Sequence, residues 1–171
     1  MALFERNKNI KVDIIKEGLL KAEAYLLDNV HHISTTFHIS FPAREIIHAE
    51  ANFQKAPYVE VCCQTSQKMA NLVGLKIRRG FAEKVNERIG GECGCHHLVD
   101  ITLEVARSMA QFIDNPQNLP LSDYIEDAGL IRNKIFEIYP KIKNMCFAYN
   151  IQNDHLFTKE VKCGLKADLM L

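Results

Sequence analysis

Apolar and polar residues alternate with a period of two through much of the first third of the chain. The alternation runs from Lys21 to Leu27, from His31 to Phe41 and from Ile47 to Phe53, with turn-forming residues between the runs. A period of two is typical of a strand with one buried face. A shorter first strand is expected at Val12–Lys16. The pattern predicts an antiparallel sheet of about three to five strands within residues 10–54.

One side of these strands is apolar, and we expect it to face a core. On the two longest strands this side comprises Ile33, Thr35, Phe37, Ile39, Phe41, Ile47, Ala49, Ala51 and Phe53. The other side is polar, so a single covering layer is sufficient. A later helix is expected to add Val105 and Met109 to the same core.

The residues after the predicted sheet carry apolar side chains at helical spacing. A first helix is expected from Pro57 to Gly74, a short second helix from Phe81 to Ile89, and a long third helix from Cys95 to Ile113. The polar, proline-containing segment Asp114–Pro120 is expected to link them to a helix that includes Ile131–Ile138. Strands first and helices afterwards predict an α+β fold, with the helices packed on one face of the sheet.

We expect a single domain over residues 1–171, because this length is sufficient for one hydrophobic core. Its strand-rich part spans residues 10–54 and its helical part spans residues 57–140. The C-terminal segment, residues 141–171, has no clear period, although Cys146–Ile151 has the pattern of a strand.

Charge and hydropathy restrict the partners and the compartment. Twenty-one acidic and twenty-one basic side chains give a formal net charge of zero, and no basic stripe is visible, so we expect no nucleic-acid partner. No apolar run approaches the roughly 18 residues of a membrane span, and the polar N-terminus lacks the apolar segment of a signal peptide. These features predict a cytoplasmic protein with free thiols and no membrane association. Cys146 and Cys163 are expected to be buried.

The densest group of reactive residues is Gly90-Gly91-Glu92-Cys93-Gly94-Cys95-His96-His97, at the start of the long helix. A helix N-terminus favours a thiolate, because its N–H groups are unpaired and its dipole is positive there. Cys95, His96 and His97 are therefore candidate metal ligands, or a nucleophile with its base.

Further candidate ligands lie in two other predicted elements. Cys62 or Cys63 on the first helix can supply a third ligand, and His31 or His32 at a strand end can supply a fourth. Thiolates and imidazoles suit zinc and iron. The expected cofactor is a zinc ion, an iron ion or an iron–sulfur cluster, although the spacing matches no recognised zinc pattern.

Five segments form a recognisable set within residues 10–150. They are Leu27-Asp28-Asn29; Ile46-Ile47 with Ala51 and Phe53; Leu72-Val73-Gly74-Leu75; Arg79-Gly80-Phe81; and Gly90-Gly91 with Gly94-Cys95-His96-His97-Leu98. This set resembles an uncharacterised bacterial family that is catalogued only as a domain of unknown function. The Gly-Cys-x-His-Leu element is moderately specific, and the family often has Thr at the position of His96, so His97 matches its histidine. The resemblance implies no activity.

The strand Ile46–Phe53, a following helix, and Gly94-Cys95 at the start of another helix are similar to the iron–sulfur cluster scaffold family of the NifU N-terminal type. This resemblance implies an antiparallel sheet followed by helices, with a cluster held by three cysteines. The third of those cysteines matches Cys95. The family's partner-recognition element, Leu-Pro-Pro-Val-Lys, is absent from this chain.

The other two cluster-binding positions of that family carry no cysteine here. The second falls near Tyr58, and Cys62 and Cys63 lie one helical turn later. The first falls near Asp28-Asn29, which is followed by His31 and His32. The resemblance therefore implies the scaffold fold more directly than cluster assembly.

Three functions stay open at this point. The first is an uncharacterised cytosolic protein that binds a metal ion or an iron–sulfur cluster at a Cys/His site. The second is a non-catalytic module that binds an unidentified protein partner, with Cys95 and His97 as ordinary structural residues. The third is a Cys-dependent enzyme, with Cys95 as nucleophile and a neighbouring histidine as base.

Overall fold

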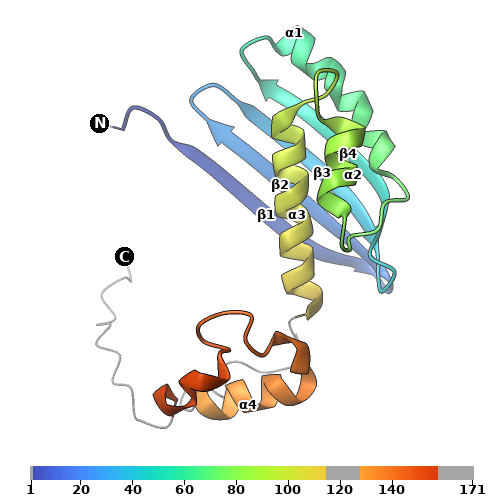
Figure 1. The fold of residues 1–171 in the computed structure, drawn as a ribbon. Coiled ribbons are helices and arrows are strands. Elements are labelled where there is room, and N and C mark those ends of the chain that lie inside the picture. The colour runs from blue at the N-terminus through green and yellow to red at the C-terminus, as the bar shows by residue number, and fades with distance from the viewer. Residues whose placement is uncertain (1, 115–127, 158–171) are drawn as a thin grey trace. The chain divides into compact units, whose positions relative to one another are not determined.

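A computed structural model of the protein describes residues 2–114 and 128–157 (Figure 1). The chain divides into two compact units, residues 1–113 and residues 114–171. Each unit is compact by itself. The expectation of a single domain over residues 1–171 stays a prediction. Of the linker expected at Asp114–Pro120, only Asp114 lies within the described residues. Cys163 lies outside them as well.

The first unit contains one antiparallel sheet of four strands, which confirms the predicted fold class. The strands follow one another in the order β1 (Arg6–Lys16), β2 (Leu19–Asp28), β3 (His32–Ser40) and β4 (Glu45–Lys55). β1 begins at Arg6 rather than at Val12, because the polar residues before Val12 pair along the end of β2. This extension brings Arg6 opposite Asp28.

A bulge between β3 and β4 corrects the predicted buried face of β4. His38 pairs with His48 but Ile39 pairs with Ile46, so β4 contains one extra residue, Ile47. An extra residue reverses the alternation on one side of a bulge. Ile46 is buried as a result, whereas Ile47 is 46% exposed. Phe41, also expected in the core, lies beyond the end of β3 and is exposed.

The helices of the first unit cover one face of the sheet, as predicted (Figure 1). They are α1 (Val59–Cys62), the 3₁₀ helix η1 (Cys63–Leu72), α2 (Phe81–Ile89) and α3 (His96–Asp114). The single helix expected from Pro57 to Gly74 is therefore largely 3₁₀. The Thr65 and Ser66 hydroxyls each donate a hydrogen bond to the carbonyl three residues earlier, at 2.6 Å. Such bonds compete with the backbone and favour the tighter helix.

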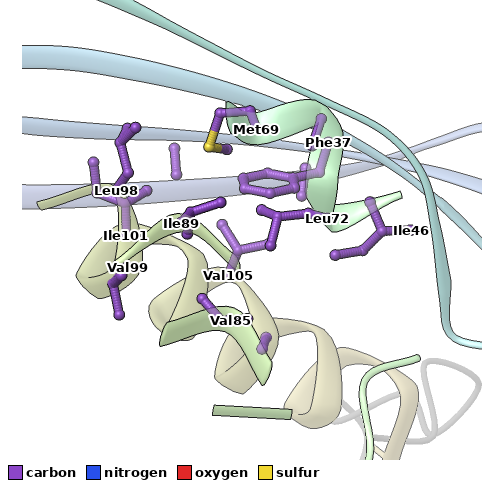
Figure 2. Close-up of a cluster of buried hydrophobic side chains, with 14 of the residues drawn as sticks. Phe37, Ile46, Met69, Leu72, Val85, Ile89, Leu98, Val99, Ile101 and Val105 are labelled. Carbon is purple, nitrogen blue, oxygen red and sulfur yellow. The ribbon is translucent and has the colours of Figure 1, made fainter. Parts of the chain in front are cut away.

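The helices and the sheet share one hydrophobic core (Figure 2). Its largest fully buried side chains include Phe37 from the sheet, Met69 and Leu72 from η1, and Leu98 and Ile101 from α3. The residues predicted to share a core do so: Phe37, Ile39, Phe53, Val105 and Met109 are buried in it, and Ala51 packs against it. The core contains side chains of β2, β3 and β4 together with Leu98 and Ile101, so it packs the first turns of α3 against the sheet.

The second unit contains α4 (Ala128–Ile138) and the short 3₁₀ helices η3 (Pro140–Ile142) and η4 (Ile151–Leu156). The buried Arg132 guanidinium organises it, by donating hydrogen bonds to Ala148 O, Asn150 O and the Asp154 carboxylate. The strand expected at Cys146–Ile151 is wrong, because this segment forms turns. The turns direct the carbonyls of Ala148 and Asn150 toward Arg132. Cys146, expected to be buried, is exposed.

Candidate functional site

The start of α3 is positioned by close backbone contacts between it and α2. The Cys95 N–H donates to Ile89 O at 2.9 Å, and the Gly94 N–H donates to Gly91 O at 3.1 Å. A Cβ atom at Gly94 would lie 2.0 Å from Ile89 O and 2.4 Å from Gly90 O. Only glycine allows the backbone to approach so closely. Gly94 therefore fixes the place at which His96 and His97 enter the helix.

Replacing Gly94 by Ala should lower the free energy of unfolding by at least about 1–3 kcal/mol, because the methyl group overlaps two backbone carbonyls that cannot rotate away. Gly91→Asn is the matched control in the same loop. Gly91 has a φ of +67°, which asparagine tolerates, and no atom lies within 4 Å of the position that a Cβ atom would occupy there. Urea unfolding should show Gly94→Ala to be clearly the less stable variant; equal stabilities would contradict the close approach.

A buried carboxylate, Asp28, lies at the end of β2 and organises the turn into β3. It accepts the backbone N–H groups of Val30 at 2.8 Å and of His31 at 2.6 Å. Its Oδ2 atom also accepts a hydrogen bond from Arg6 Nε at 2.8 Å and forms an ion pair with Arg6 Nη2 at 2.6 Å. The His31 Nδ1 atom lies 3.1 Å from Asp28 Oδ1. One carboxylate thus joins the first strand, the turn and an imidazole.

These contacts decide the ionisation of Asp28 and the tautomer of His31. Burial raises the pKa of Asp28, but the hydrogen bonds from Val30, His31 and Arg6 outweigh it and hold the pKa well below its usual range. The ionised carboxylate can only accept hydrogen bonds, so His31 Nδ1 is the donor. In the neutral imidazole, Nε2 then carries the free lone pair.

A second imidazole lies against the first. The ring centroids of His31 and His97 are 4.0 Å apart, with the planes tilted by 38°. Burial lowers the pKa of the half-buried His97, and nearby His31, Arg6 and His96 lower it further, with only Asp28 opposing them. The exposed His96 ring lies 6.0 Å from that of His97. His97 is therefore neutral at neutral pH, with a lone pair of its own.

The cations of β1 near this imidazole pair are matched by carboxylates. Arg6 is paired with Asp28, and Lys8 Nζ lies 2.6 Å from Asp100 Oδ2 on α3. The Lys8–Asp100 pair also connects β1 to the helix that carries His97. The carboxylates of Asp28 and Asp100 therefore offset part of the positive charge that Arg6 and Lys8 carry on β1.

The structure brings together only some of the predicted ligands. His31 and His97 are in contact, and His96 lies beside them. Cys95 and Cys62 pack against the core. The thiol of the exposed Cys63 donates a hydrogen bond to Glu60 O. His32 lies on β3, and Cys95 makes no hydrogen bond to an imidazole of the described residues.

In the part of the chain that the structure describes, no three His, Cys, Asp or Glu side chains are arranged to hold one metal ion. A site here is thus a pair of imidazoles with an orienting carboxylate.

Asp28 and Arg6 are members of this site that the sequence analysis missed. Asp28 carried a signal, since an Asp before a turn commonly accepts the N–H groups of the next residues. The spacing from Asp28 to His31 allowed the side-chain contact as well. Arg6 carried none, because it lies in a polar stretch that becomes a strand only by pairing with β2.

Comparison with known proteins places the first unit in a family. Residues 5–111 match the family described as "Protein of unknown function (DUF2889)", and the chain belongs to this family. The match covers the four strands and nearly all of the helical layer up to α3. No curated protein and no solved structure matches the chain. Among the described residues, no helix is long and apolar enough to cross a membrane.

Proposed function

We propose that the His31–His97 pair binds one divalent transition-metal ion, with zinc or ferrous iron as the ions of the right chemistry. The single observation that carries this proposal is the Asp28–His31 contact beside a second imidazole. Carboxylate–histidine pairs of this kind orient the ring and raise the basicity of the free nitrogen toward a metal.

The protonation states support the same proposal. His31 presents Nε2 because Nδ1 donates to Asp28. The lowered pKa of His97 removes competition between a proton and a metal near neutral pH. Imidazole nitrogen is a ligand that suits zinc and iron.

The arrangement favours a mononuclear ion over an iron–sulfur cluster. Clusters are held mainly by cysteine thiolates, but the nearest cysteine along the chain, Cys95, packs against the core. His96 is the best placed additional ligand, since its ring already lies 6.0 Å from that of His97 and is exposed. The likeness to cluster scaffolds stays a prediction.

The test is metal analysis of the full chain purified without oxygen, followed by titration of the metal-free protein with Co²⁺. We expect one equivalent to bind, with a visible absorption band. His31→Gln and His97→Gln should each weaken binding by more than the roughly 10–100-fold that loss of an outer partner costs. His96→Gln should have a smaller effect.

The chain offers a matched control in its other imidazole pair. His38 and His48 lie opposite each other on β3 and β4, with ring centroids 5.1 Å apart and no buried carboxylate behind them among the described residues. The double variant His38→Gln/His48→Gln should bind Co²⁺ as the wild type does. If this control loses the metal while His31→Gln keeps it, the proposed site is wrong. Visible bands with stoichiometric iron and sulfide would replace the ion by a cluster, and protein that takes up no metal would favour the interaction module.

A further inference from the structure

A cavity at the start of α2 is lined by basic residues and contains none of the residues of the His31–His97 site. Its volume is about 220 Å³. Its charged lining residues are Lys76, Arg78, Arg79, Lys84 and Arg88. No acidic residue lines it, although Glu83 and Glu87 lie in the same stretch of sequence. A chain of zero net charge thus concentrates five cations around one hollow.

Within the described part of the chain, the side chains of three of these cations form neither an ion pair nor a hydrogen bond. Lys76 lies 3.6 Å from Glu45, and Arg88 donates to Asn71 O at 2.6 Å. Arg78, Arg79 and Lys84 form no ion pair with any described residue. Clustering like charges without partners opposes folding, so the arrangement is typical of a site that an anion neutralises.

The backbone adds further donors at the same place. Gly80, at the N-cap of α2, has a φ of +82°, and no side chain caps the helix there. A left-handed residue before a helix turns successive N–H groups in one direction, and the helix dipole is positive at this end. The N-terminus of α2, whose first turn also carries the Glu83 carboxylate, therefore adds N–H donors to an anion site that the side chains already define.

A second, less polar cavity adjoins the first and shares Arg78 and Phe81 with it. Its volume is about 410 Å³, and its apolar lining includes Ile77, Leu103, Ala106 and Ala110. The two cavities together place a cationic pocket beside a more apolar one, whose lining also includes Arg44 and Arg107. A ligand that fills both has an anionic group and an apolar body.

We propose that these cavities bind a small organic phosphate, with the phosphoryl group among Arg78, Arg79 and Lys84 and the apolar part against Leu103 and Ala106. A phosphate dianion fits these three unpartnered cations better than a carboxylate of single charge does. The cationic cavity is smaller than the roughly 300–1,000 Å³ typical of whole-ligand pockets. It therefore accommodates one group of a ligand rather than a polymer.

The test compares inorganic phosphate with phenyl phosphate, which carries the same anionic group on an apolar ring. Calorimetry or NMR titration of the full chain should show binding of both, with phenyl phosphate the tighter. Arg79→Gln/Lys84→Gln should weaken both at least about tenfold, because charge-assisted contacts are the strongest that these side chains make.

Lys11→Gln/Lys21→Gln is the matched control, since it also removes two positive charges, from ion pairs on the sheet. It should leave both affinities unchanged. An equal loss in the control would overturn the proposal by making the effect one of overall charge. Equal affinity for phosphate and phenyl phosphate, tighter binding of a single-stranded oligonucleotide, or no binding at millimolar concentration would overturn it as well.

Discussion

Replacing Phe37 by Ala should lower the free energy of unfolding by about 3–5 kcal/mol, the usual cost of deleting a buried aromatic ring. Phe37 lies at the centre of β3 and has no exposed surface. Its partners on the neighbouring strands are Ala22 and Ala49. Neither alanine can fill the space that the ring leaves, so the cavity persists and the cost stays high. Urea or guanidinium unfolding of the full chain measures it.

Tyr25→Ala is the control for this prediction. Tyr25 lies on β2 of the same sheet, is of similar size and is 41% exposed. Its loss should cost far less, because a ring that is partly open to solvent leaves no enclosed cavity when it is removed. If the two variants were equally stable, the assignment of the buried face would be wrong, and the site built on that sheet would lose its support.

The sheet was predictable from the sequence because its signal is local. Every second residue of β2 and β3 is buried, as the alternation predicts. α2 likewise begins at Phe81 and ends at Ile89, between glycines that the sequence displays. In these elements side-chain period and backbone conformation agree, so no distant contact is needed to assign them.

Elements that depend on pairing were not predictable in the same way. β1 reaches back to Arg6 because β2 is long enough to pair with it. The exposure of Ile47 follows from a register shift against β3, which no property of β4 alone specifies. The 3₁₀ conformation of η1 depends on hydroxyl bonds such as Thr65 to Cys62, which compete closely with α-helical geometry.

The sequence predicted which types of residue form the candidate site, but it did not predict which individual residues come into contact. His31 and His97 were both named as ligands, yet their contact joins a turn and a helix that are far apart in sequence. Cys95 and Cys62 looked equally suitable, but both pack against the core. A thiol in a helix has no sequence signal that tells a ligand from a core residue.

Asp28→Ala should lower the free energy of unfolding at pH 7 by about 1.5–3 kcal/mol, the range for hydrogen bonds to a charged group, because Asp28 is buried but its partner Arg6 is partly exposed. The change leaves the N–H groups of Val30 and His31 without an acceptor and Arg6 without its counter-charge. Asp13→Ala is the matched control, since Asp13 pairs with Lys11 on the solvent-exposed part of the same strand pair. We expect it to change stability only slightly.

The pH dependence of this difference separates an ionic role of Asp28 from a purely steric one. Its hydrogen bonds hold the pKa in the folded state below the ordinary value of 3.8. The ionised carboxylate therefore stabilises the fold fully above that value, and the stabilisation is lost as the pH falls toward the folded-state pKa. The gap between wild type and Asp28→Ala should be constant from neutral pH down to about pH 5 and shrink below about pH 4. A gap that is unchanged at low pH would show that Asp28 acts by shape alone. The proposed metal site would then be wrong as well, because it depends on a charged partner that orients His31.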